Sequence, residues 1–285
     1  MNIKYIDIHS HLDFADYGAD QKNIIQKMKD LGIFTIAIGT GVKSSKEVVK
    51  LAEENINVYA CIGNHPDDEL RENFDEKDYE ELVKNPKVVA IGECGLDYFV
   101  DPKLKVESGK SKVISEEKKE RQKKEFIKQI EFAIKYDKPL MLHIRDERKP
   151  SENSEVSAYY DAYEILKEYD LPAQAGGKVK GNMHFFAGSL EWAKKFIDLG
   201  FTISFTGVIT FARQYDEVIK NIPLDKLHAE TDAPFVAPIP FRGKRNEPTY
   251  VIEVVKKIAE IRGENLETVR LQLLDNAKKT FNLKF

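Results

Sequence analysis

The sequence has few cysteines and no strong excess of charge of either sign. Its 285 residues include two cysteines, Cys61 and Cys94, which form neither a disulfide framework nor a CxxC zinc motif. Both fall in apolar, strand-like runs, so we expect buried, reduced thiols. The net charge of −4 argues against a protein that coats nucleic acid generally. It does not exclude a nuclease, because a local basic patch can hold a phosphate backbone.

Long hydrophobic runs are also absent. The longest uncharged stretch, LGIFTIAIGTGV, is too short to cross a bilayer. The N-terminal stretch MNIKYIDIH has charges where a signal peptide needs an apolar core. We therefore expect a cytoplasmic protein that does not enter a membrane.

Short β-branched runs alternate along the chain with longer, charged, amphipathic runs. This alternation predicts βαβ units and a parallel sheet. The expected strands are Tyr5–His9, Phe34–Ile38, Val58–Ile62, Val88–Glu93, Leu140–His143, Asn182–Phe185, Thr202–Phe205 and Leu227–Glu230. Eight units favour an α/β fold of the (β/α)8 TIM-barrel type, in a single domain over residues 1–285.

Helix signals fall between these strands. Ser44 and Glu47 stand at the spacing of a capping box, which predicts a helix that begins at Ser44. The final segment, Thr249–Phe285, predicts two helices, and we expect the second to be an extra C-terminal helix packed outside the barrel.

Two polar stretches, Asp101–Lys124 and Glu147–Tyr160, have the character of insertions. Both follow strand ends, where barrel enzymes place substrate loops. The alternative interpretation is solvated surface, because runs of charged residues usually lie in solvent.

The histidines are distributed unevenly. Five of the six lie at or just past the carboxyl ends of expected strands, and two carboxylates do the same: His9, His11, His65, His143, His184, Glu93 and Asp232. In a parallel barrel these strand ends open onto one face, which carries the active site, so residues far apart in sequence would converge there. His228 lies early in its strand, and we expect it to be structural.

The stretch IDIHSHLDF contains the most informative pair. His9 and His11 are two apart on a strand, so both side chains face the same side, as a metal bound through neutral imidazoles requires. Taken alone, the pair could equally cap a strand. Asp7 shares their parity one layer deeper, and we expect it to orient an imidazole through its other nitrogen. Asp13 lies past the strand, where loop hydrogen bonding is expected.

The whole set indicates more than one ion. Four imidazoles and two carboxylates are too many for one tetrahedral ion, and they suit two ions bridged by a carboxylate, with open positions for water. A purely structural protein would gain little from burying so many ionisable groups at one end.

Six sequence blocks carry a resemblance to a known family. In chain order they read DIHSHLDF, IGNHPDD, IGECGLDY, LHIRD, HFFAGS and ETDAPFVAPIPFRGKRNEP. They resemble the signature blocks of the TatD-type metal-dependent deoxyribonucleases, which belong to the amidohydrolase-like TIM-barrel superfamily. The resemblance extends from about Tyr5 to Pro248, and the blocks are specific in combination.

The resemblance implies a divalent-metal-dependent phosphodiesterase, most often a 3′–5′ exonuclease, that uses two metal ions (Mg, Mn or Zn) and a metal-activated water. Carried over to this chain, the metal ligands are His9, His11, Glu93, His143, His184 and Asp232. Glu93 would bridge the ions, with His9, His11 and Asp232 on one and with His143 and His184 on the other. Asp232 and Glu93 are also expected to be catalytic, together with His65, which would contact the scissile phosphate.

The expected substrate is DNA, single-stranded or at 3′ ends, and a monomer would suffice. Arg145, Arg242 and Arg245 are the basic candidates for phosphate contacts, because arginine binds phosphate in a bidentate manner. Aromatic residues that could stack on unpaired bases, or could instead belong to the core, are Tyr98, Phe99, Phe186, Phe235 and Phe241. Phe185–Phe186 and Phe241 depart from the family pattern, and these departures bear on substrate preference.

Two other functions fit parts of the pattern. The first is a two-metal hydrolase of small amides, lactones or phosphotriesters, although Glu93 stands where that class often has a bridging lysine. The second is a non-catalytic barrel that binds nucleic acid or a partner, although a lapsed enzyme usually loses at least one ligand.

Overall fold

The computed structural model describes residues 3–66, 73–100, 114–146, 157–170 and 178–284. Within them, eight parallel strands pair in sequence order, β1 to β8. Their bounds are β1 Tyr5–Ser10, β2 Ile33–Ile38, β3 Val58–Ile62, β4 Val88–Asp97, β5 Leu140–Arg145, β6 Gly181–His184, β7 Phe201–Phe205 and β8 Leu227–Ala229. The strands predicted from the sequence are all present. β4 continues four residues past its predicted end at Glu93, and β5 continues two past His143.

The two ends of the sheet meet through the backbone beside the predicted site. His11 N donates to Ala233 O at 2.8 Å, and Asp232 N donates to His9 O at 3.0 Å. These bonds bring β1 against the segment that follows β8, so the strands form a nearly closed TIM barrel, as predicted.

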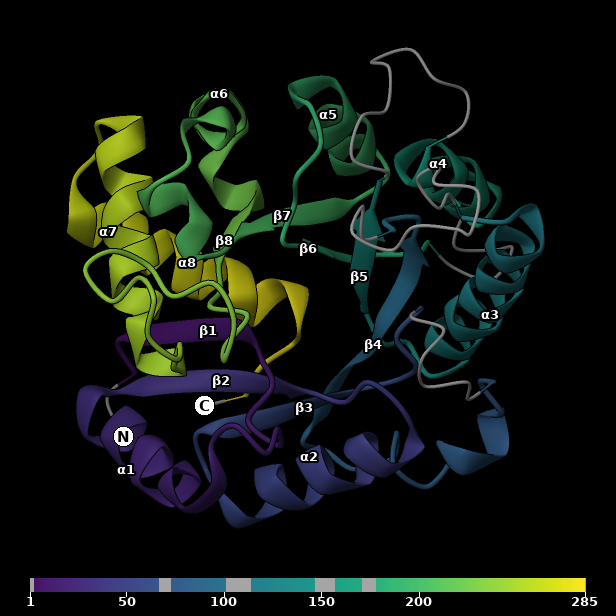
Figure 1. Cartoon of the computed structure of the whole chain (residues 1–285), viewed down its shortest axis with the longest axis horizontal. Coiled ribbons are helices and arrows are strands. Elements are labelled where there is room, and N and C mark those ends of the chain that lie inside the picture. The colour runs from purple at the N-terminus through teal and green to yellow at the C-terminus, as the bar shows by residue number, and fades with distance from the viewer. Residues whose placement is uncertain (1–2, 67–72, 101–113, 147–156, 171–177, 285) are drawn as a thin grey trace, which may run out of the picture.

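Helices surround the strands (Figure 1). Their bounds are α1 Gln21–Leu31, α2 Val42–Glu54, α3 Glu116–Lys135, α4 Ala158–Glu168, α5 Leu190–Asp198, α6 Asp216–Asn221, α7 Val251–Arg262 and α8 Leu266–Thr280. As predicted, α7 and α8 follow β8, and α8 contacts β1 and β8. None of the described helices is both long and apolar enough to span a membrane.

Apolar side chains form two separate clusters. In β2, Ile33 and Ala37 belong to the larger cluster, which includes the buried faces of the surrounding helices. Phe34, Ile36 and Ile38 point the other way, into a cluster of strand side chains. Alternate strand residues face opposite sides of a sheet, so the second cluster lies inside the barrel. We call it the interior cluster.

The end of the chain completes this interior cluster. Phe281 and Leu283, just past α8, pack with the strand residues, and Ala277 of α8 joins them. The Tyr59 hydroxyl donates to Lys284 O at 2.7 Å. The predicted extra helix is present and contacts β1 and β8, but it does not lie wholly outside the barrel, because Ala277 and the segment after the helix pack into the interior cluster.

The predicted capping box is wrong. α2 begins at Val42, after Gly41, and the Ser44 side chain does not cap it. Instead the Ser44 hydroxyl donates to Asp13 Oδ2 at 2.6 Å. This bond gives Asp13 the loop hydrogen bond expected of it.

The predicted insertions are only partly described. Residues 101–113 and 147–156 lie outside the described part of the chain. The remainder of the first stretch is largely helical, because Ser115 caps α3 by accepting from Lys118 N. The second stretch ends in another helix start, where Ser157 accepts from Tyr160 N at the beginning of α4.

Candidate active site

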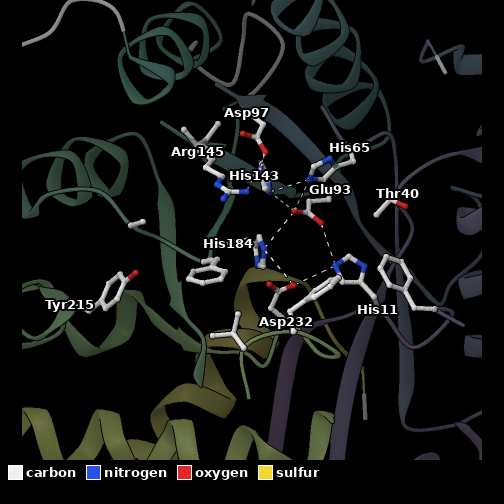
Figure 2. A pocket seen from close by; sticks show the side chains of 16 residues that line it. His11, Thr40, His65, Glu93, Asp97, His143, Arg145, His184, Tyr215 and Asp232 are labelled. Carbon is white, nitrogen blue, oxygen red and sulfur yellow. Dashed lines mark hydrogen bonds and ion pairs between the residues drawn. The ribbon is translucent and has the colours of Figure 1, made fainter. Parts of the chain in front are cut away.

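The predicted ligands from β1, β4 and β8 meet at the carboxyl ends of the strands (Figure 2). His9 Nε2 lies 3.3 Å from Glu93 Oε2 and 3.3 Å from His11 Nε2. His11 Nε2 lies 3.7 Å from Glu93 Oε2 and 3.4 Å from Asp232 Oδ1. This first group is deeply buried, because the His9 and His11 side chains are only 0% and 5% exposed.

A register shift in β1 explains how the histidines reach the site. Pairing with β2 slips between Asp7 and Ser10, so the regular alternation of side chains is interrupted there. Ile6 and Ile8 belong to the interior cluster. His9 and His11 face the site, so the side-chain pattern changes within the shifted segment.

The same shift overturns the predicted role of Asp7. Its carboxylate accepts from Thr231 Oγ1 at 2.6 Å, from Thr231 N at 2.8 Å and from His9 N at 3.3 Å. It therefore bonds to the backbone and hydroxyl of the β8 end and to the backbone of β1, and orients no imidazole. The prediction failed because it assumed unbroken alternation along the strand.

Glu93 is placed by a second register shift, in β4. Pairing with β5 slips between Gly92 and Cys94. Gly92 and Gly95 both have positive φ, and a Cβ atom on either would collide with a carbonyl oxygen of β5. The GECG sequence therefore lets β4 approach β5 closely while it turns Glu93 toward the centre of the site.

The other oxygen of Glu93 faces a second group of imidazoles. Glu93 Oε1 lies 2.7 Å from His143 Nδ1, 3.6 Å from His65 Nε2 and 3.6 Å from His184 Nε2. His65 Nε2 and His143 Nδ1 are themselves 3.3 Å apart. The side chains of His143 and His65 are 16% and 17% exposed, so this group is more open than the first.

The grouping differs in detail from the predicted division of ligands. His65 lies as close to Glu93 as His184 does, although the sequence reasoning gave it only a phosphate contact. The His184 ring also stacks on His9, with centroids 3.4 Å apart, and its Nε2 lies 4.0 Å from Asp232 Oδ1. His184 therefore lies between the two groups.

Two carboxylates behind the imidazoles were missed by the sequence reasoning. Asp97 Oδ2 lies 3.0 Å from His143 Nε2, and Glu230 Oε1 lies 3.0 Å from His184 Nδ1. Carboxylates in such positions orient a ligating imidazole and raise its basicity. Glu230 stands two residues before Asp232, the same spacing as the histidine pair, so strand alternation was a signal for it. Asp97 was hidden by the extra length of β4.

Opposed charges shift the pKa values in the site. Burial alone would raise the pKa of the Glu93 carboxyl, but the surrounding imidazoles lower it well below its usual value. Burial alone would lower the pKa of His143, but Asp97 and Glu93 raise it to about 10. The lowered pKa values of Glu93 and Asp97 keep both carboxyls ionised, and the proton held by His143 balances part of their charge. A bound cation would replace that proton.

The spacing of the donor atoms fits metal ions. In a tetrahedral site with bonds of about 2.1 Å, neighbouring ligand atoms are about 3.4 Å apart. In the first group, five separations among the donor atoms of His9, His11, Glu93 and Asp232 range from 3.3 to 3.8 Å. His9 with His11 and Glu93, and His65 with Glu93 and His143, each bring three possible ligand atoms within 4.8 Å of one another.

A cavity of about 750 Å³ opens over these groups. Arg145 lines it with a half-exposed side chain, and its guanidinium lies 3.7 Å from the centroid of the Phe99 ring. Arg242 instead stacks on Phe211, and Arg245 binds Asp20 Oδ2 at 3.0 Å. Neither of these two is among the described residues that line the cavity.

The aromatic candidates divide in the same way. Phe235 lines the cavity and is 48% exposed, and Phe14, which the sequence reasoning overlooked, lies beside it with ring centroids 6.0 Å apart. Tyr98 and Phe186 are buried in the core, and Phe241 stacks on Tyr250. The buried pair and Phe241 are therefore not available to stack on a base in this structure.

The remaining predictions concern residues away from the cavity. Cys61 and Cys94 are buried free thiols, as expected. His228 is buried at the opposite end of its strand, where its Nε2 lies 3.3 Å from Thr280 Oγ1. This position agrees with the structural role expected of it.

Fold and site together define a class of protein. A parallel barrel that gathers histidines and carboxylates at the carboxyl ends of its strands has the architecture of a metal-dependent hydrolase. The model of one such family, described as TatD related DNase, matches residues 6–282.

Individual proteins agree with this match. The chain is 36% identical to the "uncharacterized metal-dependent hydrolase YabD" of Bacillus subtilis, over 97% of this chain and 98% of that protein. It is 33% identical to YcfH of Escherichia coli K12, which has the same description, over 98% and 96% of the two chains. The crystal structure of YjjV, a TatD homologue from Escherichia coli K12, superposes with a TM-score of 0.82 at 30% identity and covers 100% of both chains. The chain belongs to the TatD-related DNase family and is a metal-dependent hydrolase.

Proposed function

We propose that this hydrolase cleaves phosphodiester bonds in DNA, with two divalent ions held on either side of Glu93. The observation that carries the proposal is the position of this single carboxylate. Its Oε2 faces His9 and its Oε1 faces His143, at 3.3 and 2.7 Å. A carboxylate with an imidazole group on each side is suited to bridging two ions.

The ligands follow from the two groups. His9, His11 and Asp232 would hold one ion with Glu93 Oε2, and His143 and His184 would hold the other with Glu93 Oε1. When bound, such ions polarise the phosphate and lower the pKa of a bound water to about 7, as zinc does.

The protein's own groups would complete the reaction. Asp232 is an ionised carboxylate at the centre of the site and would accept the proton of the attacking water. His65 borders the second group and would contact the scissile phosphate or assist the leaving oxygen. Arg145, at the cavity wall, would bind a phosphate, and Phe235 with Phe14 would stack on an unpaired base at the strand end.

The test joins metal analysis to a nuclease assay. The protein is purified without added metal, its bound divalent ions are measured, and degradation of single-stranded DNA labelled at the 5′ or the 3′ end is followed with and without chelator. Chelator-sensitive loss of nucleotides from the 3′ end is expected. Absence of chelator-sensitive cleavage of any phosphodiester would overturn the proposal.

A second candidate is hydrolysis of a small amide, lactone or phosphotriester. It is favoured by the cavity wall, where Phe14, Ile144, Phe185, Phe235 and Val236 outnumber the single arginine among the described lining residues. The same preparation, assayed on a panel of uncharged amides, lactones and phosphotriesters, separates the two candidates by which substrate class is turned over.

A further inference from the structure

The buried face of helix α3 carries two glutamines, Gln122 and Gln129, on the side that packs against the site. Gln122 and Gln129 are seven residues apart, two turns along the helix, and therefore lie on the same side of it. They are 2% and 1% exposed, as deeply buried as Phe126 and Ile130 on the same helix. Buried amides are almost always hydrogen-bonded, so the partners of these two glutamines indicate their role.

Each glutamine pairs with both backbone groups of one residue. Gln129 Oε1 accepts from Asn64 N at 2.8 Å, and its Nε2 donates to Asn64 O at 3.0 Å. Gln122 Oε1 accepts from Asp97 N at 2.9 Å, and its Nε2 donates to Asp97 O at 2.9 Å. Two bonds to one residue fix the orientation of its backbone as well as its position, as a neighbouring strand would.

Both anchored residues lie next to the second group of imidazoles. Asn64 directly precedes His65, and Asp97 holds His143 through the 3.0 Å contact to Nε2. The packing around Gln129 is close, because a Cβ atom on Gly63 would lie 2.6 Å from Gln129 Oε1. Helix α3 is thus hydrogen-bonded to the ends of β3 and β4, beside His65 and at Asp97, which contacts His143.

The first group is held differently. His9 and His11 are positioned by backbone bonds between β1 and the segment after β8, with Asp232 in the same set. The two sides of Glu93 therefore have different supports, and we expect a change at α3 to act on the His65–His143 side.

We propose that Gln122 and Gln129 are positioning residues that set the geometry of the His65–His143 side of the site. Gln122 acts through Asp97 on His143, a proposed ligand of the second ion, and so on the affinity for that ion. Gln129 acts through Asn64 on His65, the proposed phosphate contact. The proposal rests on the proposed two-ion function for its metal readout, but its geometric content holds without metal.

The variants are Gln122→Met and Gln129→Met, which keep the length of the side chain and remove both hydrogen bonds. Asn276→Leu is the matched control. Asn276 is also buried, and its amide donates to Leu224 O and Leu227 O at 2.8 Å, next to β8 at the amino end of the barrel. Because all three changes leave buried backbone groups unpaired, all three should lower thermal stability.

The distinguishing readouts are metal titration and imidazole spectra. In Mn²⁺ titrations, Gln122→Met should weaken binding of the second Mn²⁺ ion about 10- to 100-fold and leave binding of the first unchanged, because Asp97 orients a ligand of the second ion. In the metal-free chain, the ¹⁵N signals of His65 and His143 should move while those of His9 and His11 stay in place. Asn276→Leu should change neither readout.

The outcomes separate this proposal from the proposed function. The positioning role would be overturned if the ¹⁵N signals of His65 and His143 did not move, or if binding of the first and second Mn²⁺ ions were weakened equally. A wild-type protein that binds one ion only would contradict the two-ion function, yet the imidazole spectra would still decide the role of the glutamines. Should a methionine variant not fold, the glutamate variant at the same position, Gln122→Glu or Gln129→Glu, replaces it in the same measurements, because glutamate keeps the acceptor oxygen and removes the donor.

Discussion

The two ends of the barrel shift the pKa of a buried histidine in opposite directions. At the carboxyl end, His143 lies between Glu93 and Asp97, and its pKa is raised to about 10. At the amino end, none of the residues that the structure describes brings a carboxylate into an ion pair with His228, and burial lowers its pKa to about 3. The first histidine is part of a charged cluster under an open cavity, and the second is packed beside Phe281.

The fold thus places the residues of the active site and the residues that stabilise the barrel interior at opposite ends of the strands. The carboxyl end concentrates buried charge, which costs free energy and which an apolar core would avoid. The amino end holds the interior cluster, completed by the chain terminus. Mutations at the two ends should therefore move different observables.

The largest effect is expected from Glu93→Gln at the carboxyl end. The change removes the charge that faces both imidazole groups, so we expect hydrolysis to fall about 10³-fold or more, with loss of bound metal. Initial rates and metal content per chain measure this. Activity within tenfold of wild type would contradict the central place given to this carboxylate.

The counterpart at the amino end is Phe281→Ala. Phe281 is 1% exposed within the interior cluster, and its truncation should cost about 3–5 kcal/mol of unfolding free energy. Urea unfolding measures the loss. At a temperature where the variant is folded, kcat/KM should stay within about twofold of wild type. A large fall in kcat/KM would show that the terminus supports the active site as well as the core.

Much of this arrangement was predictable because two simple rules act on the sequence. Apolar periodicity identified the strands, and the convergence of parallel strand ends identified the ligand cluster. The extent of β4 was underestimated because a Gly-Glu-Cys-Gly run resembles a strand end. Asp97 was lost with it.

Other features depend on contacts that the sequence does not display. The register shift in β1 decides that Asp7 binds Thr231 and not an imidazole. Arg245 was a phosphate candidate because it lies in the basic RGKR run after strand eight, but it binds Asp20, which is 225 residues away in sequence. Local pattern predicts which residue types reach the end of a strand, whereas the direction of a long surface side chain depends on distant neighbours.

A pH-dependent effect of intermediate size is expected at His228. The folded state keeps this imidazole neutral, with a pKa of about 3, whereas the unfolded chain takes up a proton near pH 6.5. Stability from this group is therefore present at neutral pH and is lost progressively as pH falls below about 6.5 toward 3. From pH 7 to pH 5 the loss should be about 2 kcal/mol.

The variant His228→Gln isolates this contribution. Its unfolding free energy, measured by urea titration from pH 7 to pH 5, should decline less than that of wild type by about the same 2 kcal/mol. The comparison is made as the difference between the two proteins at each pH, so the acid response of the carboxyl-end cluster cancels. Parallel pH curves would mean that His228 can accept a proton in the folded barrel.

The smallest effect is expected from Arg145, at the rim of the carboxyl end. Its guanidinium is half exposed and lies over Phe99, 4.0 Å from Asp97 Oδ2, so its removal should hardly change stability. If it binds a substrate phosphate, Arg145→Ala should raise KM for single-stranded DNA about tenfold, change kcat less, and reduce the dependence of KM on salt. Arg242→Ala is the matched control, because that side chain stacks on Phe211 away from the cavity lining. Equal effects of the two variants would show that DNA is held by the general basic surface around the mouth, and that the cavity wall contributes no specific phosphate site.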